Sequence, residues 1–295
     1  MTKLCLGTAQ FGMNYGVANK KGQPSQAEVN EMVQSAWESG IDLFDTAQAY
    51  GSSEIVLGKA FEVLGISDRV KVITKLSPEL EKRPETLIIK SVRRSLANLR
   101  VPKLFSLMLH RGEWLSDWEK YYGSVFRKVI AEGMTESAGV SIYTLEEFDR
   151  ALEIPEILTI QMPFNVLDQR ARVHGCFEKA RTAGKLLFLR SIYLQGALTL
   201  ENIPEKIKFG LPHFKRFEDL SLRLGISKKE LAFQFALENS SNAVLVLGLE
   251  STLQLSENVK LAAQDRWVVQ KNLSELYQLS ENVPEKLINP ALWEK

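Results

Sequence analysis

The chain has 295 residues, of which 45% are hydrophobic and 25% are charged, a profile typical of a globular protein that allows one large barrel or two medium domains. Lysine plus arginine (37) nearly balance aspartate plus glutamate (36), so the charge predicts no partner among nucleic acids or acidic membrane surfaces. The chain has no run of about 18 apolar residues, the length that a membrane span needs, and its first residues lack a secretory pattern. Cys5 and Cys176 lie far apart, which predicts free thiols and a cytoplasmic protein.

Short apolar runs alternate along the chain with segments of helical periodicity. In chain order the runs are Leu4–Thr8, Ile41–Asp45, Val70–Lys75, Leu104–Leu109, Ser137–Ser141, Leu158–Met162, Lys185–Ser191 and Ala243–Gly248. Eight such strands are what an α/β fold of the (β/α)8 TIM-barrel type requires. No linker or change in composition divides the chain, so residues 1–295 are expected to form a single barrel domain.

The segments between the runs carry start and stop signals of helices. One helix is predicted after Ser25, which suits the N-cap position, and Gly40 marks its end. Further helices are predicted to start near Glu85, Asp117, His174, Leu211 and Ser227. A doubly wound fold is disfavoured, because the glycines after the first strand do not fit G-x-G-x-x-G and no Walker A pattern occurs.

Polar residues stand where the predicted strands end. In a barrel the loops that follow the strands converge on one face, so polar groups at these ends are candidates for catalysis. The candidates are Asp45, Lys75, His110, Ser141 and Gln161 at strand ends and Tyr50 on the loop after the second strand.

Each of these residues also has a purely structural interpretation. Asp45 could cap a helix, Lys75 could lie at a solvated edge and His110 could be a hydrogen-bonded core residue. Tyr50 could simply pack over the barrel mouth. Their convergence favours an active site, because titratable groups on adjacent strand ends shift one another's pKa values.

Other catalytic patterns are absent from the sequence. His174 and His213 fall in predicted helices, and no H-E-x-x-H or C-x-x-C spacing indicates a metal site. No G-x-S-x-G motif indicates a serine hydrolase. A Schiff base formed by Lys75, as in an aldolase-like barrel, stays open as a chemical alternative.

The segment DLFDTAQAYGSSEIVLGKAF resembles the D-T-A-x-x-Y-G-x-x-E-x-x-x-G signature of the aldo-keto reductase family. The segments VITKLS, LMLHRG, GVSIY, IQMPFN, LQGALT and LESTLQLSENV follow in the order of that family, so the resemblance covers nearly the whole chain. It implies a barrel that binds a nicotinamide cofactor and reduces aldehydes or ketones. The implied partner is a small carbonyl compound, and the implied state is a monomer or a weak homo-oligomer.

The resemblance also implies roles for the residues at the strand ends. Tyr50 would donate a proton to the carbonyl oxygen, Lys75 would pair with Asp45, and His110 would orient the carbonyl. An ammonium beside a phenol lowers its pKa, so Lys75 is expected to make Tyr50 a better acid. Asp45 would in turn neutralise the lysine.

Cofactor contacts are implied along the rest of the rim. Ser141 and Gln161 would bind the nicotinamide carboxamide, and Gly7 and Thr8 would line the ring's pocket, with Asp45 close by. The remaining implied contacts are Arg190 at the ring, Ser191, Leu194, Gln195 and Gly196 at the pyrophosphate, and Gly248, Glu250, Ser251, Gln254, Glu257 and Asn258 at the adenosine end.

Several positions depart from the family pattern. Ile142 replaces an asparagine that would bind the carboxamide, and Arg190 replaces a tyrosine that would stack on the ring. Gly248 and Gln254 stand where some members place cations for a 2′-phosphate, and Glu250 adds a negative charge. NADP is the expected cofactor from the resemblance, with NAD as the alternative.

The substrate is expected to be a polar carbonyl compound such as a sugar or a sugar derivative, because Arg111, Arg190 and Tyr193 are predicted near the rim. Two other functions remain open from the sequence. One is the Lys75 Schiff-base lyase, and the other is a redox-sensing subunit that keeps its cofactor and turns over slowly.

Overall fold

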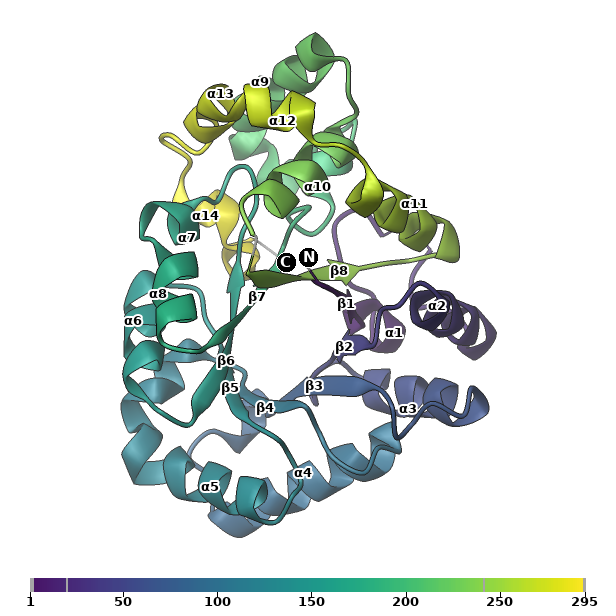
Figure 1. Cartoon of the computed structure of the whole chain (residues 1–295), viewed down its shortest axis with the longest axis vertical. Coiled ribbons are helices and arrows are strands. Elements are labelled where there is room, and N and C mark those ends of the chain that lie inside the picture. Colours follow the sequence, from purple (N-terminus) through teal and green to yellow (C-terminus); the bar gives the residue numbers. More distant parts are fainter. Residues whose placement is uncertain (1–2, 20, 241, 294–295) are drawn as a thin grey trace.

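The computed structural model describes residues 3–19, 21–240 and 242–293, and a closed barrel of parallel strands forms its centre (Figure 1). Each strand pairs with the next one along the chain, and the last pairs with the first. The strands are β1 (Lys3–Gly7), β2 (Leu43–Asp45), β3 (Lys71–Lys75), β4 (Ser106–Leu109), β5 (Ala138–Ser141), β6 (Ile157–Pro163), β7 (Leu186–Arg190) and β8 (Ala243–Gly248). The (β/α)8 barrel predicted from the sequence is therefore confirmed.

The strands are mostly shorter than the apolar runs that predicted them. Pairing of β2 with β1 begins at Cys5↔Leu43, so Ile41 and Asp42 precede the strand. Pairing of β4 with β3 begins at Ile73↔Ser106. Apolar residues next to a strand thus belong to the core without joining the ladder.

Helices surround the barrel, and every strand is followed by at least one of them (Figure 1). The α-helices are α1 (Ala9–Gly12), α2 (Gln26–Glu38), α3 (Ser53–Val63), α4 (Glu85–Leu99), α5 (Gly123–Ala131), α6 (Leu145–Glu153), α7 (Arg170–Val173), α8 (Cys176–Thr182), α9 (Leu211–Leu224), α10 (Lys228–Glu238), α11 (Thr252–Ala263), α12 (Trp267–Lys271), α13 (Leu273–Gln278) and α14 (Glu285–Ile288). Short 3-10 or π turns are η1 (Pro78–Leu80), η2 (Gly112–Asp117), η3 (Trp118–Tyr122), η4 (Ala197–Thr199), η5 (Glu205–Gly210) and η6 (Pro290–Leu292). Among the helices of these described ranges, none is both long and apolar enough to cross a membrane.

The start and stop signals of α2 act as the sequence predicts. The Ser25 hydroxyl accepts from the backbone N–H of Glu28 at 3.3 Å, and the Glu28 carboxylate accepts from the N–H of Ser25 at 2.8 Å. This capping box satisfies N–H groups that lack partners within the helix. Gly40 follows the helix with φ of +80°, a conformation that favours glycine.

Two predicted helix starts are wrong. The helix expected from His174 begins at Cys176 instead, because His174 follows the last residue of α7 and Gly175, with φ of +72°, separates α7 from α8. The segment expected to start at Asp117 opens with the π turn η3, and α5 begins only at Gly123. His213 does lie in a helix, α9, as expected.

The core has two parts, one inside the barrel and one between the barrel and the helices. Cys5, Leu43, Ile73, Met108 and Phe188 fill the inside, together with Val244 and Val246. Their neighbours in the strands point outward to the helices, as the alternation of a strand requires. Cys5 and Cys176 are buried free thiols, as predicted. Because apolar side chains fill the inside of the barrel, the polar groups gather at the C-terminal ends of the strands.

Candidate active site

The strand ends bring the predicted catalytic residues to one rim of the barrel. Asp45 and Lys75 end β2 and β3, and His110 directly follows β4. Ser141 ends β5, whereas Gln161 lies two residues before the end of β6 and is paired in register with Ser141. Because all strands are parallel, these side chains share the C-terminal face.

Asp45 and Lys75 form a buried ion pair. The Lys75 Nζ lies 2.7 Å and 2.8 Å from the two carboxylate oxygens of Asp45 and 3.0 Å from the backbone oxygen of Thr46. The two side chains are 1% and 6% exposed. The amide of Gln161 donates to the same carboxylate at 2.8 Å. Every N–H of the ammonium therefore has an acceptor, which is what a charge in a core requires.

Tyr50 lies on the loop after β2, above the ion pair. The turn that follows it depends on Gly51, which has φ of +55° and would place a Cβ 2.2 Å from the Gly12 oxygen. The Tyr50 ring centroid is 5.1 Å from the Lys75 Nζ and 5.9 Å from the ring centroid of His110, and the Tyr50 and His110 rings are perpendicular at 90°. The carboxylate, ammonium, phenol and imidazole predicted to meet are thus gathered.

Serines 52 and 53 do not cap α3, although the sequence allows it. Neither side chain makes a capping hydrogen bond at the N-cap of this helix. The Ser53 hydroxyl instead donates to the Thr8 backbone oxygen at 2.8 Å and lies 2.9 Å from the hydroxyls of Thr8 and Thr46. It therefore ties the ends of β1 and β2 together beneath Tyr50.

The pKa of Tyr50 is raised above its ordinary value, mainly because the phenol is buried and further because the Asp45 carboxylate is near. Arg190 acts in the opposite direction. The expected direction was a lowered pKa, but burial and the Asp45 carboxylate dominate at this phenol. Tyr50 consequently keeps its proton at neutral pH, as a proton donor must.

His110 is neutral in this site. Burial lowers its pKa to about 3, and the positive charges of Lys75, Arg190 and Arg111 add to the effect. Its Nδ1 is buried without a hydrogen-bond partner among the described residues. A neutral imidazole can donate one N–H, so His110 can orient an oxygen at the barrel mouth without contributing a charge.

The depressed pKa of His110 predicts a loss of stability in mild acid. Below about pH 6.5 the unfolded chain takes up a proton on this imidazole and the folded chain does not, so the free energy of unfolding falls as pH drops toward the folded value. We expect a loss of about 1–2 kcal/mol between pH 7 and 5 that is reduced in His110→Gln. Urea unfolding at the two pH values measures it. An imidazole NMR signal of His110 that titrates near pH 6.5 would contradict it.

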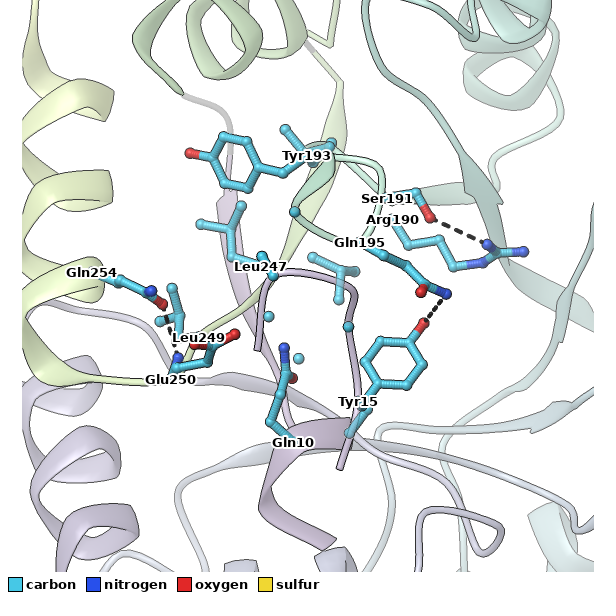
Figure 2. Close-up of a pocket in the computed structure, with 18 of the residues that line it drawn as sticks. Gln10, Tyr15, Arg190, Ser191, Tyr193, Gln195, Leu247, Leu249, Glu250 and Gln254 are labelled. Carbon is cyan, nitrogen blue, oxygen red and sulfur yellow. Dashed lines mark hydrogen bonds between the residues drawn. The ribbon is translucent and has the colours of Figure 1, made fainter. Parts of the chain in front are cut away.

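A cleft lined by Tyr50 at one end and by Gln254 and Asn258 of α11 at the other crosses the barrel mouth, with an empty volume of about 1110 Å³ including its open side. Figure 2 shows part of its lining, from Tyr15 and Arg190 to Glu250 and Gln254. Besides Tyr50, the predicted residues that line it are Gly7, Thr8, Asp45, Gln161, Arg190, Ser191, Gln195, Gly196, Gly248, Glu250, Gln254 and Asn258.

Some predicted residues do not line the cleft. Lys75 and His110 stand behind Asp45 and Tyr50, and Ser141 is buried at the end of β5. Leu194 is fully buried and turns its loop with φ of +49°. Ser251 instead caps α11, where its hydroxyl accepts from the Gln254 N–H at 3.3 Å. Glu257 pairs with Lys229.

The sequence reasoning missed residues 15–18 after α1, which meet the predicted residues 195–196 after β7 over the cleft. We call these two segments the clasp. The Val17 N–H donates to the Gln195 oxygen at 3.2 Å, and the Gln195 amide donates to the Tyr15 hydroxyl at 3.2 Å (Figure 2). A Cβ on Gly196 would lie 2.4 Å from that of Ala18. The loop after the first strand could have been included, since loops at this end converge. Nothing in the sequence marked Gln10 or Lys229, which also line the cleft.

The cleft offers contacts that suit a nicotinamide dinucleotide. The Asn258 Nδ2 is buried without a hydrogen-bond partner among the described residues. This amide can therefore donate to a ligand at the end of the cleft beside α11. At two positions of the lining, Gly196 and Gly248, a Cβ would crowd a neighbouring side chain. A Cβ on Gly248 would lie 2.8 Å from the Gln10 amide. Side-chain amides and a helix start can bind a carboxamide, hydroxyls and phosphate. Within the described ranges, no cluster of His, Cys, Asp or Glu could hold a metal ion.

The fold and the rim together define a class of protein, a single (β/α)8 barrel that carries a polar site and a long cleft at the C-terminal ends of its strands. The chain belongs to the aldo/keto reductase family, whose family model matches residues 3–276. Members of this family are NAD(P)-dependent oxidoreductases.

Known proteins resemble the chain at low identity. Aldo-keto reductase YhdN of Bacillus subtilis is 28% identical over 147 residues, which cover 47% of this chain and 44% of that protein, less than half of each. A putative voltage-gated potassium channel subunit beta of Schizosaccharomyces pombe is 27% identical over 274 residues, 77% of each protein. The holo form of aldo-keto reductase AKR11C1 from Bacillus halodurans superposes with a TM-score of 0.78 over 95% of this chain and 93% of that one, at 21% identity.

Proposed function

We propose that the chain reduces an aldehyde or ketone to an alcohol, with a hydride from a reduced nicotinamide cofactor and a proton from Tyr50. The observation that carries this proposal is the buried Asp45–Lys75 pair beneath a protonated Tyr50, with neutral His110 edge-on to its ring. Cofactor titration followed by turnover of a panel of carbonyl compounds tests it.

The residues divide the work of the reaction. The bound nicotinamide would supply the hydride. The Tyr50 phenol, kept protonated by burial, donates its proton as the carbonyl oxygen gains negative charge. Lys75 then stabilises the phenolate that remains, from 5.1 Å below the ring centroid. His110 donates an N–H toward the same oxygen and holds the carbonyl in place.

The cofactor would lie along the cleft. Gln161 would exchange its hydrogen bond with Asp45 for one with the carboxamide, beside Ser141. The loop that ends at Gly196 would face the pyrophosphate beneath the clasp. The adenosine end would meet Gly248, Glu250, Gln254 and Asn258, where α11 begins with Ser251 as its cap.

We propose NADH as the preferred cofactor, against the family habit that favours NADP. Glu250 lines the cleft, and burial raises the pKa of its carboxyl, opposed by Lys21. Lys229, the lysine that lines the same cleft, is already paired with Glu257. A carboxylate can accept from ribose hydroxyls and repels a 2′-phosphate.

The Glu250→Ser variant should gain affinity for NADPH by about tenfold, because removing one close negative charge is worth about 1.4 kcal/mol. Its affinity for NADH should fall. Fluorescence titration of both cofactors measures the change, and Glu153→Ser, an exposed glutamate on α6, serves as the control. Tighter binding of NADPH than of NADH to the wild type would contradict the proposed preference.

A polar carbonyl compound such as a sugar or sugar derivative is the proposed substrate. Of the three rim residues on which the sequence based this proposal, two are engaged with other residues in the structure. Tyr193 donates to Asn258 at 2.7 Å and so belongs to the α11 end of the cleft, and Arg111 is engaged with Glu113 at 3.2 Å. Arg190 and Tyr15 remain as polar groups beside the mouth. Faster reduction of simple hydrophobic aldehydes than of any sugar would overturn this part of the proposal.

The alternatives are separable by experiment. A Schiff base requires a free lone pair on Lys75, and its Nζ already donates to Asp45 and Thr46, which disfavours that chemistry. Borohydride trapping of a covalent Lys75 adduct would favour it. The likeness to a putative channel subunit supports a slow redox-sensing role, which a very low kcat with tight cofactor binding would indicate.

A further inference from the structure

Arg190 holds a positive charge at the mouth of the cleft. It ends β7, is partly buried, and lies with its guanidinium carbon 4.1 Å from the ring centroid of Tyr143. One terminal nitrogen donates to the Ile142 backbone oxygen at 3.0 Å, and the other is 3.5 Å from the Ser191 hydroxyl (Figure 2). Both acceptors are neutral, and the guanidinium has five N–H groups to offer.

No carboxylate among the described residues pairs with Arg190. The buried acid nearest the catalytic centre, Asp45, is bound to Lys75 and Gln161. Glu147 lies close in sequence to Tyr143, and it accepts from the backbone N–H groups of Tyr143 and Thr144. By contrast, the partly buried Arg170 has a bidentate bond to Asp168 with both distances 2.8 Å. The Asp45–Lys75 pair is neutral as a whole, so Arg190 leaves the mouth with an excess positive charge.

This charge acts on the reacting groups. Arg190 contributes to lowering the pKa of His110 and opposes the raised pKa of Tyr50. It also opposes the raised pKa of Tyr15, which lies in the clasp and lines the same cleft. An anion held by the guanidinium would therefore lie near the carbonyl group that Tyr50 protonates.

We propose that Arg190 binds an anionic group of the substrate, so that the preferred carbonyl compounds carry a carboxylate or a phosphate a few bonds from the reacting carbon. The inference rests on the proposed function and narrows it. A planar guanidinium matches both anions with paired hydrogen bonds, and its stacking on Tyr143 fixes its plane in advance. A partly buried cation without an acidic partner gains most from such a ligand.

The test compares matched substrates with and without the charge. Glyoxylate against glycolaldehyde tests a carboxylate, and glyceraldehyde 3-phosphate against glyceraldehyde tests a phosphate. We expect kcat/KM of the wild type to favour the anionic member of at least one pair by about 10- to 100-fold. Arg190→Met should remove this preference mainly by raising KM for the anion, and Arg190→Lys should keep part of it.

Arg172 provides the matched control, because its guanidinium carbon likewise stacks on a tyrosine, 3.7 Å from the ring centroid of Tyr277, outside the cleft. Arg172→Met should leave the preference unchanged. Calorimetric titration of glycolate and inorganic phosphate into wild type and Arg190→Met, with cofactor present, tests binding without turnover, and at least one anion should bind the wild type more tightly.

Several results would overturn the inference. These are equal or better reduction of the neutral compounds by the wild type, an unchanged preference in Arg190→Met, and a variant that loses only cofactor affinity, which would assign Arg190 to the nicotinamide. If both anions fail to bind and neutral carbonyls are still reduced, the inference fails and the proposed function stands. If the wild type binds no nicotinamide cofactor and reduces no carbonyl, the proposed function itself fails.

Discussion

Replacing Tyr50 by phenylalanine should leave cofactor binding intact and lower kcat for carbonyl reduction by about 10²- to 10⁴-fold, the usual contribution of a general acid. The substitution removes one hydroxyl and keeps the ring that packs against His110 and Lys75. The hydride would then move to a carbonyl whose oxygen has no proton donor. Steady-state kinetics together with cofactor titration measure both effects.

Tyr121 provides a control, because it is also a tyrosine whose ring contacts a lysine, Lys120 on η3, but it does not line the cleft. Tyr121→Phe should change neither kcat nor cofactor affinity. If Tyr50→Phe keeps kcat within a factor of a few, Tyr50 is not the acid.

Breaking the Asp45–Lys75 pair should have the largest effect on stability. Asp45→Asn leaves the Lys75 ammonium unpaired, with a side chain that is 1% exposed. Lys75→Met leaves the Asp45 carboxylate unpaired, with a side chain that is 6% exposed. An uncompensated buried charge costs about 3–5 kcal/mol, so each variant should lower the free energy of unfolding by that amount. Both should also lose most of their activity. Urea unfolding and steady-state turnover measure the two consequences.

The double variant Asp45→Leu/Lys75→Met separates stability from catalysis. Removing both charges leaves no unpaired ion, so the double variant should recover most of the stability that either single variant loses. It should remain inactive, because Tyr50 no longer has a cation beneath its ring. Additive losses of stability in the double variant would show that the pair is not coupled.

Much of the fold could be predicted because barrel strands are short, apolar and regularly spaced. The alternation of these runs with helical segments predicted the barrel, and the strand ends predicted that Asp45, Lys75 and His110 meet. Helix ends were less predictable where two signals compete. The helix predicted to begin at His174 begins at Cys176, because Gly175 with φ of +72° separates it from α7.

The details of the site depended on packing that a sequence does not display. Lys75 was expected to lower the pKa of Tyr50, and burial together with Asp45 outweighs it. Ser53 lies at the start of α3 without capping it, and its hydroxyl donates to the Thr8 backbone oxygen at the end of β1. The clasp joins residues about 180 positions apart, Tyr15 and Gln195, and no local pattern indicates such a contact.

The most direct test of the central claim is the single-turnover rate at which a carbonyl compound oxidises the bound reduced cofactor, measured by the loss of nicotinamide absorbance. The wild type should oxidise its cofactor only when a carbonyl is added, and Tyr50→Phe should do so more slowly by the same factor as its kcat falls. An equal rate in the two proteins, or a wild type whose bound cofactor stays reduced with every carbonyl tried, would contradict the assignment of Tyr50 as the acid of a carbonyl reductase.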